Sequence, residues 1–261
     1  MQALNIAATG MLAQQLNVEV ISNNIANLNT TGFKQHRAEF QDLIYQNERN
    51  VGASSSDNNT IVPVGVQVGT GVKAAAVYRI TQQGTLLSTN NPLDIAIQGR
   101  GYFQILQPDG TTAYTRAGSF QLSPTGEIVT ADGFVVQPGI TLPNNTIAVT
   151  VNANGQVLAQ VAGQTQPQTV GQLQLANFPN EAGLEELGNN LLAETSASGA
   201  PTTGNPGTTG FGQLQQGFLE SSNVNVVSEI TDLITAQRAY EMNSKVIQSA
   251  DQMSQTLSQI Q

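Results

Sequence analysis

The chain has 261 residues, and its formal net charge of −9 argues against a nucleic-acid partner. It contains no cysteine, which excludes a disulfide framework and a thiolate metal site. No run of about 18 apolar residues is present, so the sequence predicts no membrane insertion. Residues 1–21 lack Lys and Arg, and they do not match a cleavable secretory signal.

Residues 3–28 have the spacing of an amphipathic helix, and Gly32 is a stop signal after it. The apolar residues expected on one face of this helix are Leu4, Ala8, Met11, Val18 and Ile25.

The next segment is predicted to be an arm and a linker. Residues 33–45 allow a short helix or an extended arm, and residues 46–60 are polar and rich in Gly, Ser and Asn, as in a loop. Strand periodicity follows, because small or polar residues alternate with Val62, Val64, Val66 and Val68.

Residues 72–219 carry the signals of short strands joined by tight turns. Gly accepts the positive φ angle that these turns need. Four turn signals follow one another: Pro108-Asp109-Gly110, Ser123-Pro124-Thr125-Gly126, Ala131-Asp132-Gly133 and Asn152-Ala153-Asn154-Gly155. The pattern predicts an antiparallel β domain.

Residues 223–261 contain no Gly and no Pro and predict one long helix, with Asn223 or Asn225 as its N-cap. A helix of about 35 residues would be roughly 50 Å long, which is more than a core of this size needs. Its apolar face therefore needs a partner, and we expect this face to comprise Ile230, Leu233, Ile234, Tyr240, Val246, Ile247, Ala250, Met253, Leu257 and Ile260.

These elements predict an α+β fold in which the two terminal helices pair as a coiled-coil core domain and a mainly antiparallel β domain is inserted between them. The expected division is a terminal helical domain of residues 1–32 plus 223–261, an arm and linker of residues 33–72, and a β-rich outer domain of residues 73–222.

No catalytic, cofactor or metal site is predicted, and the sequence favours a structural protein over an enzyme. His36 is the only histidine, and a lone His without Cys does not make the usual zinc site. Asp109 and Asp132 lie in turn signals, where Asp is favoured for local hydrogen bonding. Two other classes stay open: a secreted β-rich binding module, and a carbohydrate-active enzyme in which two carboxylates meet in a cleft.

Two terminal segments resemble a known family. SNNIANLNTTGFK and ESSNVNVVSEITDLITAQRAYEMNSKVIQSADQM are similar to the paired terminal signatures of the bacterial flagellar rod and hook proteins. VGTGV, PDGTTAYTRAGSFQ and ETSASGAP resemble the members that build the distal part of the rod. The residues that carry the terminal motifs are Asn23, Asn24, Asn27, Gly32, Phe33, Asn223, Gln237, Arg238 and Tyr240.

The resemblance implies a structural subunit of the distal rod, which polymerises into the helical tube that transmits torque from motor to hook. The implied partners are further copies of the chain, proximal rod proteins, a hook or hook-type axial protein, the bushing of P and L rings, and the flagellar export apparatus. The implied location is the basal body in the periplasm and through the outer-membrane ring, reached without a cleaved signal peptide. A proximal rod subunit of the same family is the alternative.

The segment from Gln46 to Val68 carries a further hypothesis. Loops of this length are uncommon inside compact domains. In a polymer the strand-like half could pair with a neighbouring subunit and stiffen the shaft; the alternative is a solvated linker.

Overall fold

The computed structural model describes residues 2–49 and 64–260, with side chains described as far as Thr256 at the C-terminal end. The chain divides into two compact units. The helical unit comprises Met1–Ile25, His36–Tyr78 and Asn225–Gln261, and the β unit comprises Ala26–Gln35 and Arg79–Val224. The expected three-part division concerns how parts of the chain fold independently, and it stays a prediction.

The two predicted terminal helices are present as α1 (Gln2–Ala26) and α2 (Val226–Ile260). Asn225 caps α2, because its side-chain oxygen accepts hydrogen bonds from the backbone N–H groups of Val227 (3.0 Å) and Ser228 (3.3 Å). Of the two candidate caps, Asn225 is therefore the one that the structure uses.

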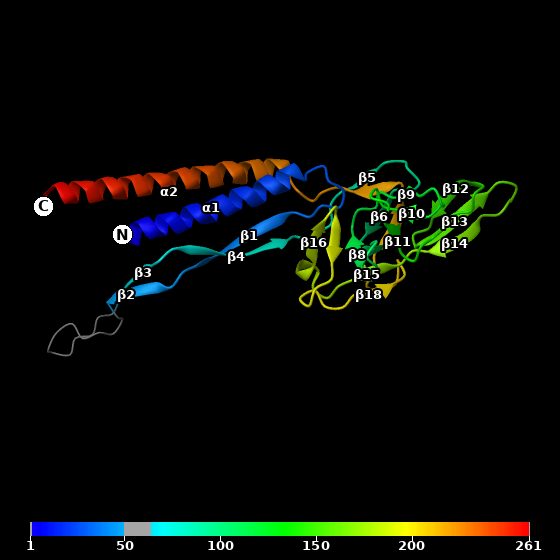
Figure 1. The fold of residues 1–261 in the computed structure, drawn as a ribbon, viewed down its shortest axis with the longest axis horizontal. Helices are drawn as coiled ribbons and strands as arrows, with labels where there is room; N and C mark the ends of the chain where they lie inside the picture. The colour runs from blue at the N-terminus through cyan, green and yellow to red at the C-terminus, as the bar shows by residue number, and fades with distance from the viewer. Residues whose placement is uncertain (1, 50–63, 261) are drawn as a thin grey trace. The chain divides into compact units, whose positions relative to one another are not determined.

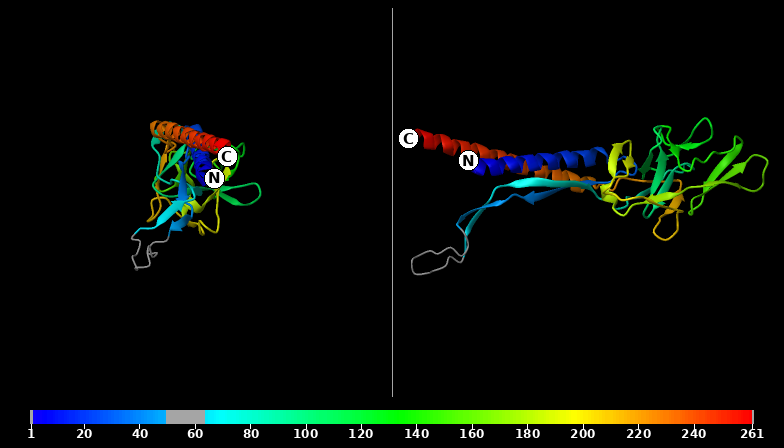
Figure 2. Two further views of the ribbon diagram at one scale, coloured as in Figure 1. Left: turned by 90° about the vertical axis from the view of Figure 1, so that its left-hand side faces the viewer. Right: turned by 60° about the horizontal axis from the view of Figure 1, so that its bottom comes forward.

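Within the helical unit, α1 and α2 lie side by side and run in opposite directions (Figures 1 and 2). The Asn24 amide donates to the Glu229 carboxylate (3.1 Å), and a Cβ atom added to Gly10 would lie 2.8 Å from the amide nitrogen of Asn243. The spacing from Gly10 to Asn24 equals the spacing from Glu229 to Asn243, so the helices keep one antiparallel register between these contacts. In this register, the part of α2 from Met253 onward extends beyond the first residues of α1.

The arm between the helix and the β unit is extended. β1 (His36–Asp42) pairs with β4 (Val72–Arg79), and β2 (Tyr45–Arg49) pairs antiparallel with β3 (Val66–Gly69). Of the two options for residues 33–45, the extended arm is thus correct over β1. Val66 and Val68 pair with β2 of their own chain. The pairing of this segment with a neighbouring subunit stays a prediction. The rest of that hypothesis falls on residues 50–63, outside the described residues.

The β unit is built from short strands. They are β5 (Leu86–Ser88), β6 (Ile95–Gln98), β7 (Tyr102–Leu106), β8 (Thr112–Thr115), β9 (Gln121–Leu122), β10 (Ile128–Val129), β11 (Val135–Val136), β12 (Thr146–Val151), β13 (Gln156–Val161), β14 (Gln168–Gln172), β15 (Leu175–Asn177), β16 (Glu185–Gly188), β17 (Leu191–Ala193), β18 (Thr202–Gly204), β19 (Gln213–Gln216) and β20 (Phe218–Glu220). A 3-10 turn, η1 (Glu181–Gly183), precedes β16.

The largest sheet has nine strands, with β16-β17-β8-β7-β11-β10-β9 as its main path and β15 and β18 attached through β7. β12, β13 and β14 form a three-stranded sheet, and β6 pairs with β19 and β5 with β20. The strand pairs of the β unit are antiparallel, so the predicted α+β fold with an antiparallel β region is confirmed.

The four predicted turns are confirmed, and each has its glycine at a positive φ angle. Gly110, Gly126, Gly133 and Gly155 have φ values of 85°, 82°, 83° and 86°. They lie between β7 and β8, β9 and β10, β10 and β11, and β12 and β13. The larger of two clusters of buried apolar residues includes Phe103, which meets Phe120 edge to face at 5.0 Å between ring centres. The smaller cluster includes Tyr102, Tyr114 and Phe178.

A buried carboxylate joins segments of the β unit that are far apart in the sequence. The side chain of Glu220, at the end of β20, is 1% exposed and forms an ion pair with Lys34. It also accepts hydrogen bonds from Arg116 Nε (2.6 Å) and from the backbone N–H of Gly84 (2.9 Å). The residues that follow α1, the segment before β5, the loop after β8 and the last strand therefore meet at one group.

The two cations on Glu220 also satisfy backbone carbonyl groups. Lys34 donates to the carbonyl oxygen of Gln82 (2.9 Å), and the Arg116 guanidinium donates to the carbonyl oxygens of Ile97, Gly99 and Gly101. Burial by itself would raise the pKa of Glu220. The charges of Arg116 and Lys34, with their hydrogen bonds, outweigh burial and hold the pKa of this carboxyl below its ordinary value of 4.5.

The Glu220→Gln substitution is expected to lower the free energy of unfolding by about 3–5 kcal/mol, because it leaves two buried cations without a counter-charge. Denaturant unfolding followed by circular dichroism measures the change. The matched control is Glu185→Gln on the exposed strand β16, for which we expect a change within about 0.5 kcal/mol. Equal losses in both variants would contradict a special role for Glu220.

The stability should also depend on pH in a defined direction. Since the folded-state pKa of Glu220 lies below 4.5, its contribution is fully present above that pH and is lost as the pH falls through the folded-state pKa. We expect the free energy of unfolding to drop on acidification toward roughly pH 3, and to drop less steeply in Glu220→Gln. Parallel pH profiles for the two proteins would show that other groups cause the acid sensitivity.

Candidate assembly interface

Asn24, in the N-terminal motif, makes contacts to two other elements of the helical unit. It is 1% exposed. Its side-chain oxygen accepts the backbone N–H of His36 (2.8 Å), and its amide nitrogen donates to the His36 carbonyl (2.8 Å) and to Glu229. The side-chain amide of Asn24 therefore forms with His36 of β1 the two hydrogen bonds that a backbone amide of a neighbouring strand could form. It also binds α2 through Glu229. Asn23, beside it, is exposed.

Gly32 occupies a position in the β unit that only glycine fits. Its φ angle is 69°, and a Cβ atom there would lie 2.8 Å from the backbone nitrogen of Ala117. Its N–H donates to the carbonyl oxygen of Glu220 (2.8 Å). Before it, Asn27 accepts a hydrogen bond from the Thr30 hydroxyl (3.1 Å), and Phe33 after it is half-buried. The N-terminal motif thus forms a fixed turn.

Asn223, in the C-terminal motif, connects the segment before β1 to the segment after β4 instead of capping a helix. Its side-chain oxygen accepts the backbone N–H of Gln35 (2.7 Å), and its amide nitrogen donates to the carbonyl oxygens of Ile80 and Gln82, both at 3.0 Å. Asn223 therefore brings together the residues after the N-terminal motif and those after β4. Gln237 and Arg238 are exposed on α2, as is Tyr240.

On α1 the contact with α2 is made mainly by small and polar residues. Gly10 and Asn24 belong to a row with helical spacing of three and four, which also contains Ala13, Asn17 and Val20. On α2 the corresponding row is Glu229, Leu233, Ala236, Tyr240, Asn243, Ile247 and Ala250. The sequence prediction did not place Gly10 in the helix contact, because it considered large apolar residues. The available signal was a Gly inside a helix, three residues before Ala13.

The predicted apolar face of α1 lies beside this contact row. Leu4, Ala8, Met11, Val18 and Ile25 are half-buried. These five residues follow a row that is shifted by one residue from the row of Gly10 and Asn24. The shift turns them about 100° around the helix. Their assembly role stays a prediction.

The predicted apolar residues of α2 divide into two groups. Leu233, Tyr240, Ile247 and Ala250 belong to the row that carries the contacts with α1. Ile230, Ile234, Val246 and Met253 are 45%, 45%, 48% and 60% exposed. The side chains of Leu257 and Ile260 lie outside the described residues. The second group leaves large apolar side chains exposed on α2, with Ile230 and Ile234 toward its start and Val246 and Met253 on another side of the helix toward its end.

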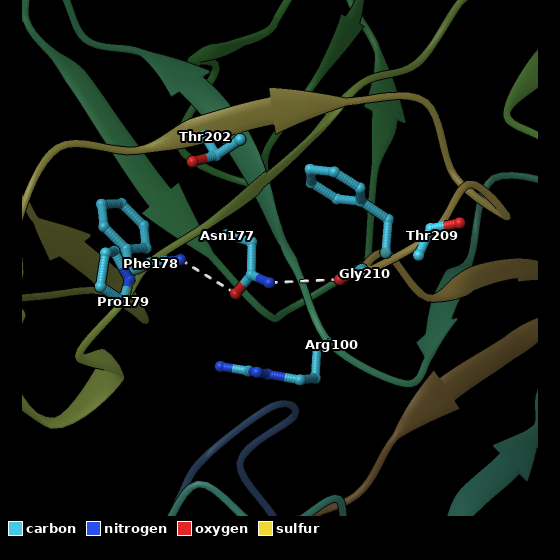
Figure 3. A pocket seen from close by; sticks show the side chains of 8 residues that line it. Arg100, Asn177, Phe178, Pro179, Thr202, Thr209 and Gly210 are labelled. Atoms are coloured by element: carbon cyan, nitrogen blue, oxygen red, sulfur yellow. Dashed lines mark hydrogen bonds between the residues drawn. The ribbon is translucent and has the colours of Figure 1, made fainter.

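The β unit has an open pocket of about 320 Å³, shown in Figure 3. Asn177 spans it, donating to the carbonyl oxygen of Gly210 (3.2 Å) and accepting the N–H of Phe178 (2.9 Å). Arg100, the ionisable side chain of the lining, is held by two hydrogen bonds to Glu181. These contacts brace loops, and we assign the pocket no ligand.

Residues 2–49 and 64–260 contain no helix long and apolar enough to cross a membrane. Over the same residues, no three His, Asp or Glu side chains are grouped as metal ligands are.

Three family models match the chain. Residues 4–34 match the model "Flagella basal body rod protein", residues 96–159 match "Flagellar hook protein FlgE/F/G D1 domain", and residues 215–260 match "Flagellar basal body rod FlgEFG protein C-terminal". The two terminal matches contain the turn at Gly32 and the helix α2 described above.

Curated relatives match over nearly their whole length. The "Flagellar basal-body rod protein FlgG" of Caulobacter vibrioides is 64% identical over 100% of this chain and 99% of its own. The proteins of the same name from Agrobacterium fabrum (99% of this chain, 98% of the relative) and Bacillus subtilis (98% of each) are 54% and 38% identical. The chain therefore belongs to the family of flagellar basal-body rod proteins, and it is a structural subunit of the flagellar basal body.

Proposed function

We propose that the chain polymerises into the helical tube of the distal rod, the drive shaft that transmits torque from motor to hook. In this proposal the terminal helices form the core of the tube. The proposal rests on the family resemblance and on one structural observation, the large apolar side chains that are exposed along α2.

Several large apolar side chains of α2 stay exposed although α2 pairs with α1. α1 and α2 meet through Gly10, Asn24 and their partners, so Ile230, Ile234, Val246 and Met253 are left exposed. Isolated helices are marginally stable in water without a packed apolar face. Contact with the helices of further copies would bury these side chains and stabilise the helix at the same time.

Within each subunit, the pairing of α1 and α2 as a coiled coil is part of the proposal. The rows that contain Gly10 and Asn24 on α1, and Glu229 and Asn243 on α2, have the alternating spacing of three and four that coiled coils use. The buried Asn24–Glu229 contact fits the known use of polar groups to fix helix register.

The proposed partners are further copies of the chain, proximal rod proteins, a hook or hook-type axial protein, the P and L ring bushing and the export apparatus. The proposed location is the periplasm and the outer-membrane ring, reached through the flagellar export apparatus without a cleaved signal peptide. These finer assignments follow from the family resemblance.

The Met253→Asp variant tests the proposed interface. It should abolish polymerisation, because it places an unpaired charge in a packed apolar contact at a cost of several kcal/mol. The matched control is Gln255→Asp, which adds the same charge to an exposed polar position on the opposite side of the same helix and should still polymerise. Electron microscopy of the purified proteins reads out assembly, and circular dichroism checks that the β unit is folded. If Met253→Asp formed normal tubes, the result would show that α2 is not part of the interface between subunits.

Hydrogen exchange tests whether assembly orders the helices. In the monomer at low concentration, we expect weak amide protection from Val226 to Met253, because the helix lacks a partner for its exposed apolar side chains. Protection should rise strongly in the polymer. The buried strands β6 and β7 serve as the internal reference and should be protected in both states. Strong protection of α2 in the monomer would contradict the prediction.

A further inference from the structure

The chain passes between the helical unit and the β unit four times. The crossings follow Ile25, Gln35, Tyr78 and Val224. In the proposed tube the terminal helices form the core, so torque that reaches the helices passes to the β unit of the same subunit along these connections. How firmly the connecting segments are bonded to one another therefore bears on the stiffness of the shaft.

On the β-unit side, one side-chain amide joins three of the four connections. Asn223 lies just before the last crossing, and its oxygen accepts the N–H of Gln35 (2.7 Å), the residue before the second crossing. Its nitrogen donates to the carbonyl oxygens of Ile80 and Gln82, both at 3.0 Å, just after the third crossing. The Ile80 N–H also donates to the Gln35 carbonyl oxygen (2.8 Å). The three segments are therefore bonded together where they leave the β unit.

On the helical-unit side, a second amide joins three connections in the same way. Asn24 lies just before the first crossing and binds both backbone groups of His36, the residue after the second crossing. It also donates to Glu229, in the first turn of α2 after the last crossing. Since Gln35 and His36 are neighbours in the chain, the second connection is held by Asn223 immediately before the crossing and by Asn24 immediately after it.

These asparagines join distant segments, which distinguishes them from asparagines that shape a local turn. In a local turn, an Asn side chain bonds backbone groups a few residues away. The partners of Asn223 are 188, 143 and 141 residues away, and Glu229 is 205 residues from Asn24.

The bonds of Asn223 are also continuous with the buried ion pairs of the β unit. The Gln82 carbonyl oxygen accepts a hydrogen bond from Lys34 as well (2.9 Å), and Lys34 pairs with Glu220. Polar networks in which each group is satisfied are rigid. The connecting segments are therefore attached to the most firmly bonded part of the β unit.

We propose that Asn24 and Asn223 act as a pair of clamps, which make the connecting segments resist bending and twisting as one bundle. The inference rests on the proposed drive shaft and names positioning residues that serve it. Without the two amides, each connecting segment could slide past the others and would resist a load alone.

Hydrogen exchange on the purified monomer, followed by NMR, tests the clamp itself. Asn223→Ala removes the acceptor of the Gln35 N–H, and this amide should exchange faster by about tenfold or more. The amides of the buried strand β7 should keep their protection. The matched control is Asn177→Ala, which removes an amide that bonds the Gly210 carbonyl oxygen in the same unit and should leave the exchange of Gln35 unchanged.

Electron microscopy of tubes grown from purified protein tests the mechanical role. Tubes of Asn223→Ala should have a bending persistence length lower by about twofold or more, because the polar network no longer holds the segments together. Tubes of Asn177→Ala should be as stiff as those of the unaltered chain. Asn223 is the better residue to change, because Asn24 also contacts α2, and its loss would alter the helix pairing as well.

Four outcomes would overturn the inference. Tubes of Asn223→Ala with unchanged stiffness would show that the clamp bears no load, while the proposed polymer stands. Failure of this variant alone to assemble would make Asn223 an assembly residue instead. Equal acceleration of exchange at Gln35 and in β7 would mean that Asn223 supports the whole β unit. If the unaltered chain forms no tube, the proposed function fails and the mechanical role fails with it, whereas the exchange experiment still decides whether Asn223 holds Gln35.

Discussion

The β unit depends on the buried charge of Glu220. Three donors from separate parts of the chain converge on this carboxylate, and its two cations in turn hold carbonyl groups of Gln82, Ile97, Gly99 and Gly101. Burying three charges is costly unless each is paired and hydrogen-bonded, so the cluster forms only when all the segments are in place. It makes the residues that follow α1 a part of the β unit, although they are distant in sequence from β20.

In the helical unit, different residues make the contact between α1 and α2 and remain available for contacts with other molecules. Small and polar residues at Gly10, Asn24 and Ala236 allow close approach and fix the register within the chain. Large apolar residues at Ile230, Ile234, Val246 and Met253 are left for contacts with other molecules. A subunit that had buried its large apolar residues internally would have less to gain from assembly, since apolar burial is the main favourable term in association.

Charge is distributed in a related way in the β unit. Lys34 and Arg116 pair with Glu220 in the interior, whereas Arg100 is 62% exposed in its pair with Glu181. Carboxylates such as Asp109 and Glu194 are exposed. The excess of negative charge on the surface opposes non-specific association of copies.

The sequence by itself determined the α+β class, both terminal helices, the cap at Asn225 as one of two candidates, the four glycine turns and the family. These rest on local patterns: helical periodicity, turn chemistry and contiguous motifs. Only the tertiary structure decided that Asn223 joins the segments before β1 and after β4, that Gly10 faces Asn243, and that Val66 and Val68 pair with β2. It also decided that Glu220 pairs with Lys34 and Arg116. The physical reason is that these contacts join residues far apart in the chain. Periodicity shows which face of an element is apolar, but not which distant group a buried Asn, Gly or Glu will meet.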